Sequence, residues 1–211
     1  MFFRITQIFF RIYFFLYHRA SIKGLPRLKN FLAGLGGKPV ILAANHESFL
    51  DPPLIGMLFP SPIRFIAGDW LFKVPILGKL IPPLGAVPVT PENKNLAASL
   101  LRDTIGFIKN GYSVLIFPEG ERTLDGKLLP LEGGVALVSL KTQTPIVPVW
   151  VDTFEAYPPG KKFPRPRRVA VEFGEPIFPD ALPSGMLEKE RREVLLAALK
   201  KSLEEIRDSA A

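Results

Sequence analysis

The sequence predicts an α/β fold with a mostly parallel central sheet flanked by helices and an amphipathic helix at the amino end. Short runs of β-branched and apolar residues, bounded by Pro or Gly, alternate with longer stretches of helical periodicity. Strands that alternate with helices favour parallel pairing, because each helix supplies the crossover between two strands. With 211 residues, 47% of them hydrophobic, the chain is long enough to bury one core and form one domain.

The individual elements follow from these patterns. Six apolar runs are expected to be strands: residues 40–44, 63–67, 86–89, 113–117, 146–151 and 169–173. Four segments are expected to be helices: residues 51–59, 93–110, 133–143 and 186–207. The Asn-Gly pair at 110–111 is a common helix stop. Pro-rich stretches such as IPPLGAVP are expected to be turns.

The first 19 residues, MFFRITQIFFRIYFFLYHR, are expected to form a membrane-associating helix. Arg4, Arg11 and His18 recur every seven residues and therefore share one stripe of a helix. Gln7 lies on the same stripe, and mostly apolar side chains fill the rest. Such a helix suits the bilayer interface, with Arg near anionic headgroups and Phe in the acyl boundary. The alternative is an amphipathic helix packed on the protein's own core.

Charge divides the chain into two parts. Residues 1–40 contain seven basic and no acidic residues, and the rest of the chain contains 20 of each, so the net charge of +7 belongs to the amino end. We therefore expect a membrane-interface helix and a basic connector over residues 1–38, and an α/β domain over residues 39–211. The dense Phe near the amino end does not indicate a nucleic-acid surface. A basic run at residues 161–168 is interpreted either as a solvated surface or as a contact for anionic lipid or a donor's phosphates.

Missing residue types exclude several kinds of chemistry. A chain without Cys has no disulfides, no Cys-ligated zinc, no iron–sulfur cluster and no thiol nucleophile. The two imidazoles, His18 and His46, do not form a metal-ligand pattern, and HESFL is not the zinc motif HExxH. The segment GLGGKP lacks the spacing of a nucleotide-binding loop. The expectation is therefore no metal and no cofactor.

Two polar clusters follow predicted strands, where α/β proteins place their ligands. In the first, NHESFLDPP, His46 and Asp51 lie five steps apart, so on a regular helix they would point about 140° away from each other. The two prolines after Asp51 favour a helix start there, with a turn before it that lets the two side chains meet. Asp51 would then orient His46 as a base. The alternative is a helix cap beside an ordinary loop histidine.

The second cluster, FPEGERT, places Glu119, Glu121 and Arg122 around Gly120. The glycine permits close approach of a ligand to the backbone, and the guanidinium fork suits a phosphate. The alternative is a solvated turn with an ion pair inside the loop.

In this order, the two clusters resemble the motifs of the glycerolipid acyltransferase family, and in particular those of bacterial 1-acylglycerol-3-phosphate acyltransferases. NHESFLDP is similar to the family's NHxSxxD motif through Asn45, His46, Ser48 and Asp51. FPEGERT is similar to its FPEGxRS/T motif, carried by Phe117, Pro118, Glu119, Gly120, Arg122 and Thr123. TPIVPV and GAVPV resemble two further family segments, so the resemblance covers residues 39–151.

The resemblance implies acyl transfer from acyl-CoA or acyl carrier protein to the hydroxyl of a lysophospholipid, most simply 1-acylglycerol-3-phosphate. His46 would be the general base and Asp51 would orient it. The substrate-binding residues would be Asn45, Ser48, Glu119, Gly120, Arg122 and Thr123. Apolar residues within 63–84 would form an acyl groove. The protein would associate with the membrane lipid surface as a peripheral or monotopic enzyme, on the cytoplasmic face of the inner membrane.

The chain departs from the family pattern at two positions. The GAVPV segment is followed by Thr90 and Pro91 where the family has an Arg, and Lys94 is the nearest basic substitute. Glu132 lies where the family often has a Lys after FPEGxR. Two alternatives therefore remain open: the same chemistry on another lyso-lipid, such as an amino-acid lipid or glycolipid, or a non-catalytic membrane-binding protein.

Overall fold

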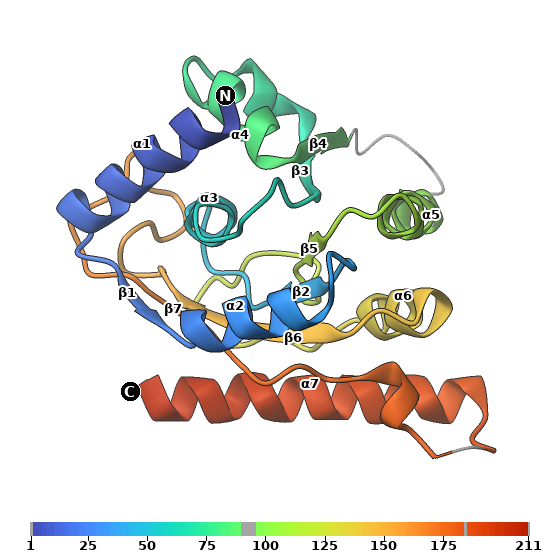
Figure 1. The fold of residues 1–211 in the computed structure, drawn as a ribbon. Coiled ribbons are helices and arrows are strands. Elements are labelled where there is room, and N and C mark those ends of the chain that lie inside the picture. The colour runs from blue at the N-terminus through green and yellow to red at the C-terminus, as the bar shows by residue number, and fades with distance from the viewer. Residues whose placement is uncertain (1, 90–95, 184, 211) are drawn as a thin grey trace.

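A computed structural model describes residues 2–89, 96–183 and 185–210. Its main sheet has five strands in the order β1-β7-β6-β2-β5 (Figure 1). The strands are β1 (Ser21–Lys23), β2 (Ile41–Ala44), β5 (Val114–Ile116), β6 (Ile146–Asp152) and β7 (Ala170–Phe173). All neighbours pair in parallel except β6 and β7, which are antiparallel. The predicted mostly parallel α/β sheet is confirmed.

A second, two-stranded parallel sheet consists of β3 (Phe65–Gly68) and β4 (Ala86–Val89). An isolated parallel bridge from Arg64 to Val114 connects the start of β3 to β5. The two sheets therefore lie edge to edge. Thr90 and Pro91, which stand where the family has an Arg, and Lys94, the expected basic substitute, lie outside the described residues.

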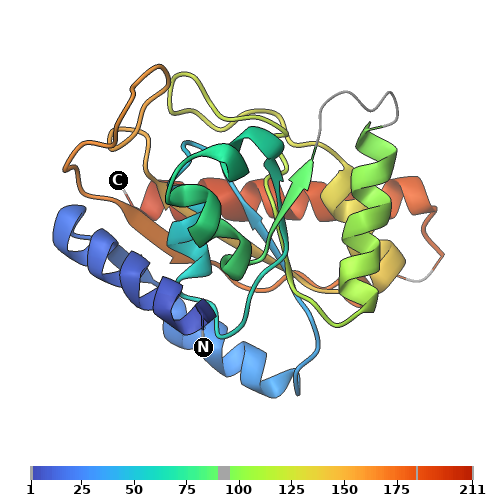
Figure 2. The same ribbon diagram turned by 90° about the horizontal axis from the view of Figure 1, so that it is seen from above.

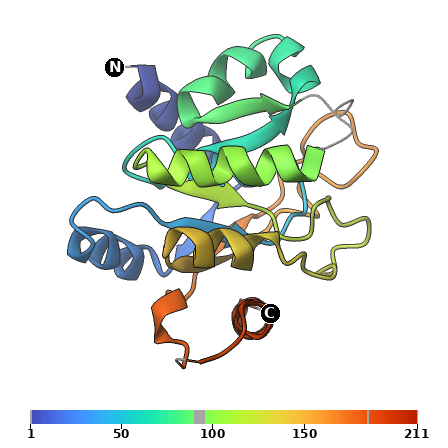
Figure 3. The ribbon, with the colours of Figure 1, turned by 90° about the vertical axis from the view of Figure 1, so that its right-hand side faces the viewer.

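Helices cover both faces of the main sheet. The helices are α1 (Phe2–Tyr17), α2 (Leu25–Gly34), α3 (Asp51–Gly56), α4 (Leu77–Leu84), α5 (Leu96–Lys109), α6 (Gly134–Thr142) and α7 (Glu188–Ala210). Strand β2 shows how the core divides, because its side chains alternate between faces. Leu42 and Ala44 join a cluster that includes residues of α1, α2, α3 and α4. Ile41 and Ala43 join a cluster with residues of α5, α6 and α7. Figure 3 shows the ribbon with α5 and α6 toward the viewer.

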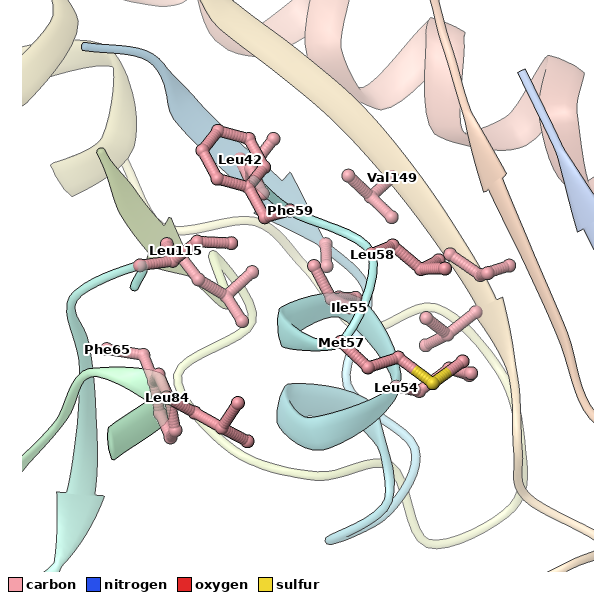
Figure 4. Packing of buried hydrophobic residues seen from close by; sticks show 14 of the residues in the cluster. Leu42, Leu54, Ile55, Met57, Leu58, Phe59, Phe65, Leu84, Leu115 and Val149 are labelled. Carbon is pink, nitrogen blue, oxygen red and sulfur yellow. The ribbon is translucent and has the colours of Figure 1, made fainter. Parts of the chain in front are cut away.

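Helix α3 is short but central. Its residues Leu54 and Ile55 are fully buried, as is Met57 directly after it. They pack among Leu42 and Phe65 of the two sheets and Leu84 of α4 (Figure 4). At about 1.5–3 kcal/mol for each fully buried aliphatic side chain, this packing holds the start of α3 firmly in place.

The expected connector over residues 21–38 is wrong. Residues 21–23 form an edge strand that pairs with β7, and residues 25–34 form α2. Gly24 makes this turn possible: its φ is 71°, and a Cβ there would overlap the carbonyl oxygen of Phe173. Pro26 then occupies the first turn of α2, where a missing N–H is harmless.

The expected turn at IPPLGAVP is also wrong in its first half. Pro82 and Pro83 lie in the last turn of α4, and the helix ends at Gly85 in a left-handed conformation with a φ of 109°. A short 3₁₀ segment, η1 (Asp69–Lys73), precedes α4 and was not expected either. The two prolines therefore lie inside the helix and not in a turn, and α4 ends one residue after Pro83.

Helix α1 forms as predicted, but its polar stripe does not face outward as a unit. Gln7 is buried and donates to the carbonyl oxygens of Met57 and Phe59, at 3.3 and 2.7 Å. His18 is fully buried between the hydroxyl of Tyr13 and the carbonyl oxygen of Arg167. The expectation that this stripe lies toward lipid headgroups is therefore wrong for these two residues.

The side of α1 that faces away from the protein is largely apolar. Its exposed large side chains are Phe2, Ile5, Ile8, Phe9, Ile12, Phe15, Leu16 and Tyr17. Arg4 and Arg11 are exposed as well, although Nε of Arg11 donates to the carbonyl oxygen of Met57. Among the described residues, no helix has both the length and the hydropathy to cross a bilayer.

Candidate active site

The two polar clusters meet at one edge of the sheet. Strands β2 and β5 are parallel neighbours, so the NHESFLDP loop after β2 and the FPEGERT loop after β5 leave the sheet side by side. A backbone bond from Thr123 N to the His46 carbonyl oxygen, 2.9 Å long, joins the loops directly. The chain thus assembles the predicted site where open α/β sheets bind ligands.

His46 and Asp51 form a hydrogen-bonded pair. Nδ1 of His46 lies 2.7 Å from Oδ2 of Asp51. Asp51 is the first residue of α3, followed by Pro52 and Pro53, and its carboxylate is fully buried. The imidazole is 17% exposed, and no described residue hydrogen-bonds its Nε2. The side chain is therefore anchored through one nitrogen and open at the other, as a general base requires.

The Asp51 carboxylate is held by more than the histidine. Oδ2 accepts hydrogen bonds from the amides of Glu47 and Ser48, at 2.8 and 2.9 Å. Oδ1 accepts from the hydroxyls of Ser48 and Thr153. These donors favour the ionised carboxylate and fix the oxygen that faces the ring of His46.

Glu119 positions His46 from the other loop. One carboxylate oxygen accepts from the backbone amide of His46 at 2.6 Å, and the other accepts from the amide of Leu129 at 2.6 Å. Burial raises the pKa of Glu119 above its ordinary value, and the bonds from Leu129 and His46 partly offset this. Both oxygens thus bind backbone within the protein, and a contact of Glu119 with the acceptor stays a prediction.

Three further predicted site residues are buried and bonded inside the protein. Asn45 extends strand pairing, because its amide group exchanges two hydrogen bonds with the backbone of Val151. The Ser48 hydroxyl lies within hydrogen-bond distance of both Oδ1 of Asp51 and the Thr153 hydroxyl, at 3.2 and 2.8 Å. Thr123 donates to Asp125. The positions of these side chains indicate that they build the loops around His46.

Of the predicted substrate-binding residues, Gly120 and Arg122 are the two that solvent reaches. Gly120 adopts a φ of 76° and lines a cavity beside His46, with open space where a side chain would lie. The Arg122 guanidinium lies over the ring of Phe49, 3.7 Å from its centroid. No ion pair joins Arg122 to a carboxylate within the described part of the chain. The alternative of an intraloop ion pair is therefore not what the structure shows for Arg122.

Two cavities adjoin His46. One, of about 300 Å³, lies among β5, α5 and α6 and is lined by residues that include Arg64, Thr104, Phe107 and Glu132. The other, of about 150 Å³, is lined by Pro52, Trp70, Leu71, Leu77 and Ile81 among others. His46, Phe65, Ile66 and Phe117 line both. The smaller cavity is formed largely by the predicted acyl-groove segment 63–84.

The sequence did not predict the roles of two residues of the site, Phe117 and Glu47. Phe117 stacks on the imidazole of His46, with ring centroids 3.9 Å apart. Glu47 is buried, and its Oε2 accepts from the amides of Thr153 and Phe154 at 2.6 and 2.8 Å. Burial raises the pKa of Glu47 to about 8, with the nearby charge of Asp51 adding to the shift. The position of Glu47 inside the NHESFLDP segment, between His46 and Ser48, was the available signal for this residue.

The chain is similar to known acyltransferases. A family model described as Acyltransferase matches residues 20–152. A chloroplast 1-acyl-sn-glycerol-3-phosphate acyltransferase of Brassica napus is 30% identical over 145 residues, which are 69% of this chain and 40% of the relative. One from Bacillus subtilis is 26% identical over 167 residues, covering 79% of this chain and 80% of that protein.

A solved structure is also similar. The 1-acyl-sn-glycerophosphate acyltransferase of Thermotoga maritima matches with a TM-score of 0.75 and 28% identity, over 97% of this chain and 79% of that one. The chain spans less than half the length of the plant relative, although it spans most of the bacterial proteins. The matched region contains both loops, and on this basis the chain belongs to the acyltransferase family.

Proposed function

We propose that this protein transfers an acyl group from a thioester, acyl-CoA or acyl carrier protein, to the free hydroxyl of 1-acylglycerol-3-phosphate, giving phosphatidate. The observation that carries the proposal is the 2.7 Å bond between His46 and Asp51, with Nε2 of His46 directed away from that bond beside two largely apolar cavities. The activities named for the relatives support lysophosphatidate as acceptor.

The reaction needs one base and no acyl-enzyme. Nε2 of His46 takes the proton of the acceptor hydroxyl while its oxygen attacks the thioester carbonyl carbon. The tetrahedral intermediate collapses, the carbon–sulfur bond breaks, and the imidazolium returns the proton to the departing thiolate. Asp51 stabilises the imidazolium while it exists and holds Nδ1 as the protonated nitrogen.

Arg122 is the proposed contact for the acceptor phosphate. Its guanidinium stacks on Phe49, which belongs to the same loop as His46, so the charge is held near the base. A guanidinium binds phosphate through paired donors. Replacing Arg122 by Ala is expected to raise the KM for lysophosphatidate at least tenfold, and replacing it by Lys should restore part of the loss.

The two cavities are the proposed places for acyl chains. Their linings are mainly apolar, and both reach His46. The transferred acyl group and the chain already on the acceptor must both lie near the reacting atoms, so two apolar compartments suit the reaction.

The membrane is the proposed source of the acceptor. The exposed apolar side of α1 would enter the interfacial region of one leaflet, while Gln7 and His18 attach the helix to the protein. This gives a peripheral or monotopic enzyme, which we place on the cytoplasmic face because both thioester donors are cytoplasmic.

A second acceptor class remains a candidate because of Glu132. This residue is exposed and lines the larger cavity beside Gly120. A carboxylate there would repel a phosphate and would accept hydrogen bonds from an uncharged or cationic headgroup. An amino-acid lyso-lipid or a lyso-glycolipid would meet this condition.

The test is an acylation assay of the purified protein with lysophosphatidate, an amino-acid lyso-lipid and a lyso-glycolipid, each with both donors. Product from lysophosphatidate supports the main proposal, and product only from another lyso-lipid supports the second. Absence of product from all acceptors contradicts both. The matched variant His46→Ala is expected to lose turnover while it still binds vesicles, and retained turnover would refute His46 as the base.

A further inference from the structure

A basic surface lies beside the carboxyl end of α1. It consists of the loop between β6 and β7, residues 157–168, which we call the basic loop, together with Arg19. Its cationic side chains are exposed: Arg19, Lys161, Lys162, Arg165, Arg167 and Arg168. None of these pairs with an acidic side chain within the ranges that the structure describes. The loop is the orange segment next to the end of α1 in Figures 1 and 2.

The basic loop is attached to α1 by specific contacts. The Tyr17 hydroxyl donates to the carbonyl oxygen of Pro164 at 3.1 Å. Nδ1 of the buried His18 lies 3.0 Å from the carbonyl oxygen of Arg167, and the amide of Val169 donates to the carbonyl oxygen of His18. Burial lowers the pKa of His18, so its ring is neutral in this junction at neutral pH. Three hydrogen bonds therefore join the loop to the end of the helix.

The basic loop also exposes an aromatic residue between its charges. Phe163 is 73% exposed and follows Lys161 and Lys162 directly, with Arg165 two residues later. On the adjoining end of α1, Leu16 is 79% exposed. An apolar side chain surrounded by cations is the arrangement that binds an anionic bilayer, since the ring enters the interface while the cations meet phosphates.

We propose that the basic loop and Arg19 form a second membrane contact that selects anionic phospholipid headgroups, in addition to the contact made by the adjoining apolar side of α1. This inference rests on the proposed function only in that the protein works at a membrane. Charge complementarity and continuity with the exposed apolar side of α1 argue for a bilayer as the occupant. A negatively charged carrier protein would need the cations, but it would leave the exposed Phe163 and Leu16 unexplained.

The inference is tested by vesicle binding without substrate, so the outcome does not depend on turnover. The full-length variant Lys161→Gln, Lys162→Gln, Arg165→Gln is compared with a control, Lys29→Gln, Lys38→Gln, Lys109→Gln, which loses the same charge elsewhere. The control lysines are exposed and form no ion pair with the described carboxylates. Vesicles are phosphatidylcholine alone, or phosphatidylcholine with roughly a third of phosphatidylglycerol.

The loop variant is expected to bind the anionic vesicles roughly a hundredfold more weakly than the wild type, with little change on phosphatidylcholine. The control should stay within a few fold of the wild type. Equal weakening of both variants would overturn the inference, because it would reduce the effect to net charge. Phe163→Ser should weaken binding to both kinds of vesicle, and an unchanged affinity would overturn the placement of the ring in the interface.

The rival occupant has its own readout. Binding of purified acyl carrier protein is measured in the absence of vesicles for the same two variants. Weaker binding by the loop variant alone, with vesicle binding intact, would overturn the membrane assignment in favour of a protein partner. Vesicle binding lost and carrier-protein binding unchanged would support it. A wild-type protein without acyltransfer activity would refute the proposed function and leave this vesicle result standing.

Discussion

Oδ2 of Asp51 lies 2.7 Å from Nδ1 of His46 and also accepts hydrogen bonds from the backbone amides of Glu47 and Ser48. One oxygen therefore has three donors, and two of them are backbone groups that cannot rotate away. The carboxylate is fixed by the turn that precedes α3, and the histidine ring is fixed by the carboxylate. This makes the orientation of His46 a property of the loop as a whole.

Replacing Asp51 by Asn should lower kcat by about two to four orders of magnitude. The amide removes the charge that stabilises the imidazolium. An NH₂ group in the place of Oδ2 would also face the backbone amides of Glu47 and Ser48, which are donors and cannot accept its hydrogens. Steady-state rates with saturating thioester measure the effect, with circular dichroism to verify folding. Asp208→Asn, an exposed carboxylate on α7, is the control and should leave kcat unchanged. A rate for Asp51→Asn within twofold of the wild type would contradict the proposed role.

Glu47 should make stability depend on pH. Its pKa is raised to about 8 in the folded protein, chiefly by burial, so the folded state holds a proton that the unfolded state has released above about pH 4.5. Stability from this group is present at low pH and is lost as the pH rises through 8. The loss is at most about 1.4 kcal/mol for each pH unit in this window. Urea unfolding at pH 5, 6.5 and 8 measures it.

Glu47→Gln is the matched variant, because it keeps the shape and an oxygen for the amides of Thr153 and Phe154 but does not titrate. As the pH rises, the wild type should lose unfolding free energy relative to the variant. Other titrating groups cancel in this difference. Parallel stability profiles for the two proteins would show that Glu47 does not titrate in this range.

Helix α1 offers a way to separate membrane contact from folding. Ile8 and Ile12 are more than half exposed, whereas Phe14 is fully buried. The double variant Ile8→Ser, Ile12→Ser should weaken vesicle binding at least tenfold with little change in stability. Phe14→Ala should instead destabilise the fold by about 3–5 kcal/mol. Vesicle co-sedimentation and thermal unfolding on each variant measure the two effects, and vesicle binding unaffected by the double change would refute the interfacial role of α1.

Gly85 should not tolerate a side chain. Its φ is 109°, and a Cβ would overlap the carbonyl oxygen of Ile63. This oxygen belongs to the backbone and cannot move aside as a flexible side chain could. Gly85→Ala should destabilise the fold by several kcal/mol, more than backbone strain alone. Gly36→Ala is the control, because Gly36 has a φ of 61° with open space around it and should lose about 1 kcal/mol. Chemical unfolding compares them, and equal losses would show that the close approach to Ile63 is unimportant.

The fold class and the central dyad could be predicted from the sequence because their causes are local. The apolar runs of β2, β5 and β6 are strong period-2 or continuous patterns, and a run of this kind needs no distant partner to be recognised. Asp51 followed by two prolines predicts that a helix starts there. The turn before this start brings the ring of His46 to the Asp51 carboxylate. Strand β1 was not predictable in this way, because its three residues become a strand only by pairing with β7.

The roles within the site needed the tertiary structure. Asp51 and Thr153 are 102 residues apart, and no sequence spacing predicts that the Thr153 hydroxyl donates a hydrogen bond to the Asp51 carboxylate. The inward position of Gln7 had the same origin: the stripe was visible in the sequence, but the carbonyl groups of Met57 and Phe59 that accept its hydrogen bonds were not. The sequence by itself determined the amino-terminal helix, strands β2, β5, β6 and β7 and the two polar loops, because local periodicity and turn residues are sufficient for these. The tertiary structure decided which face of each element is buried, because a buried polar group goes to the backbone donors and acceptors that other segments leave unpaired.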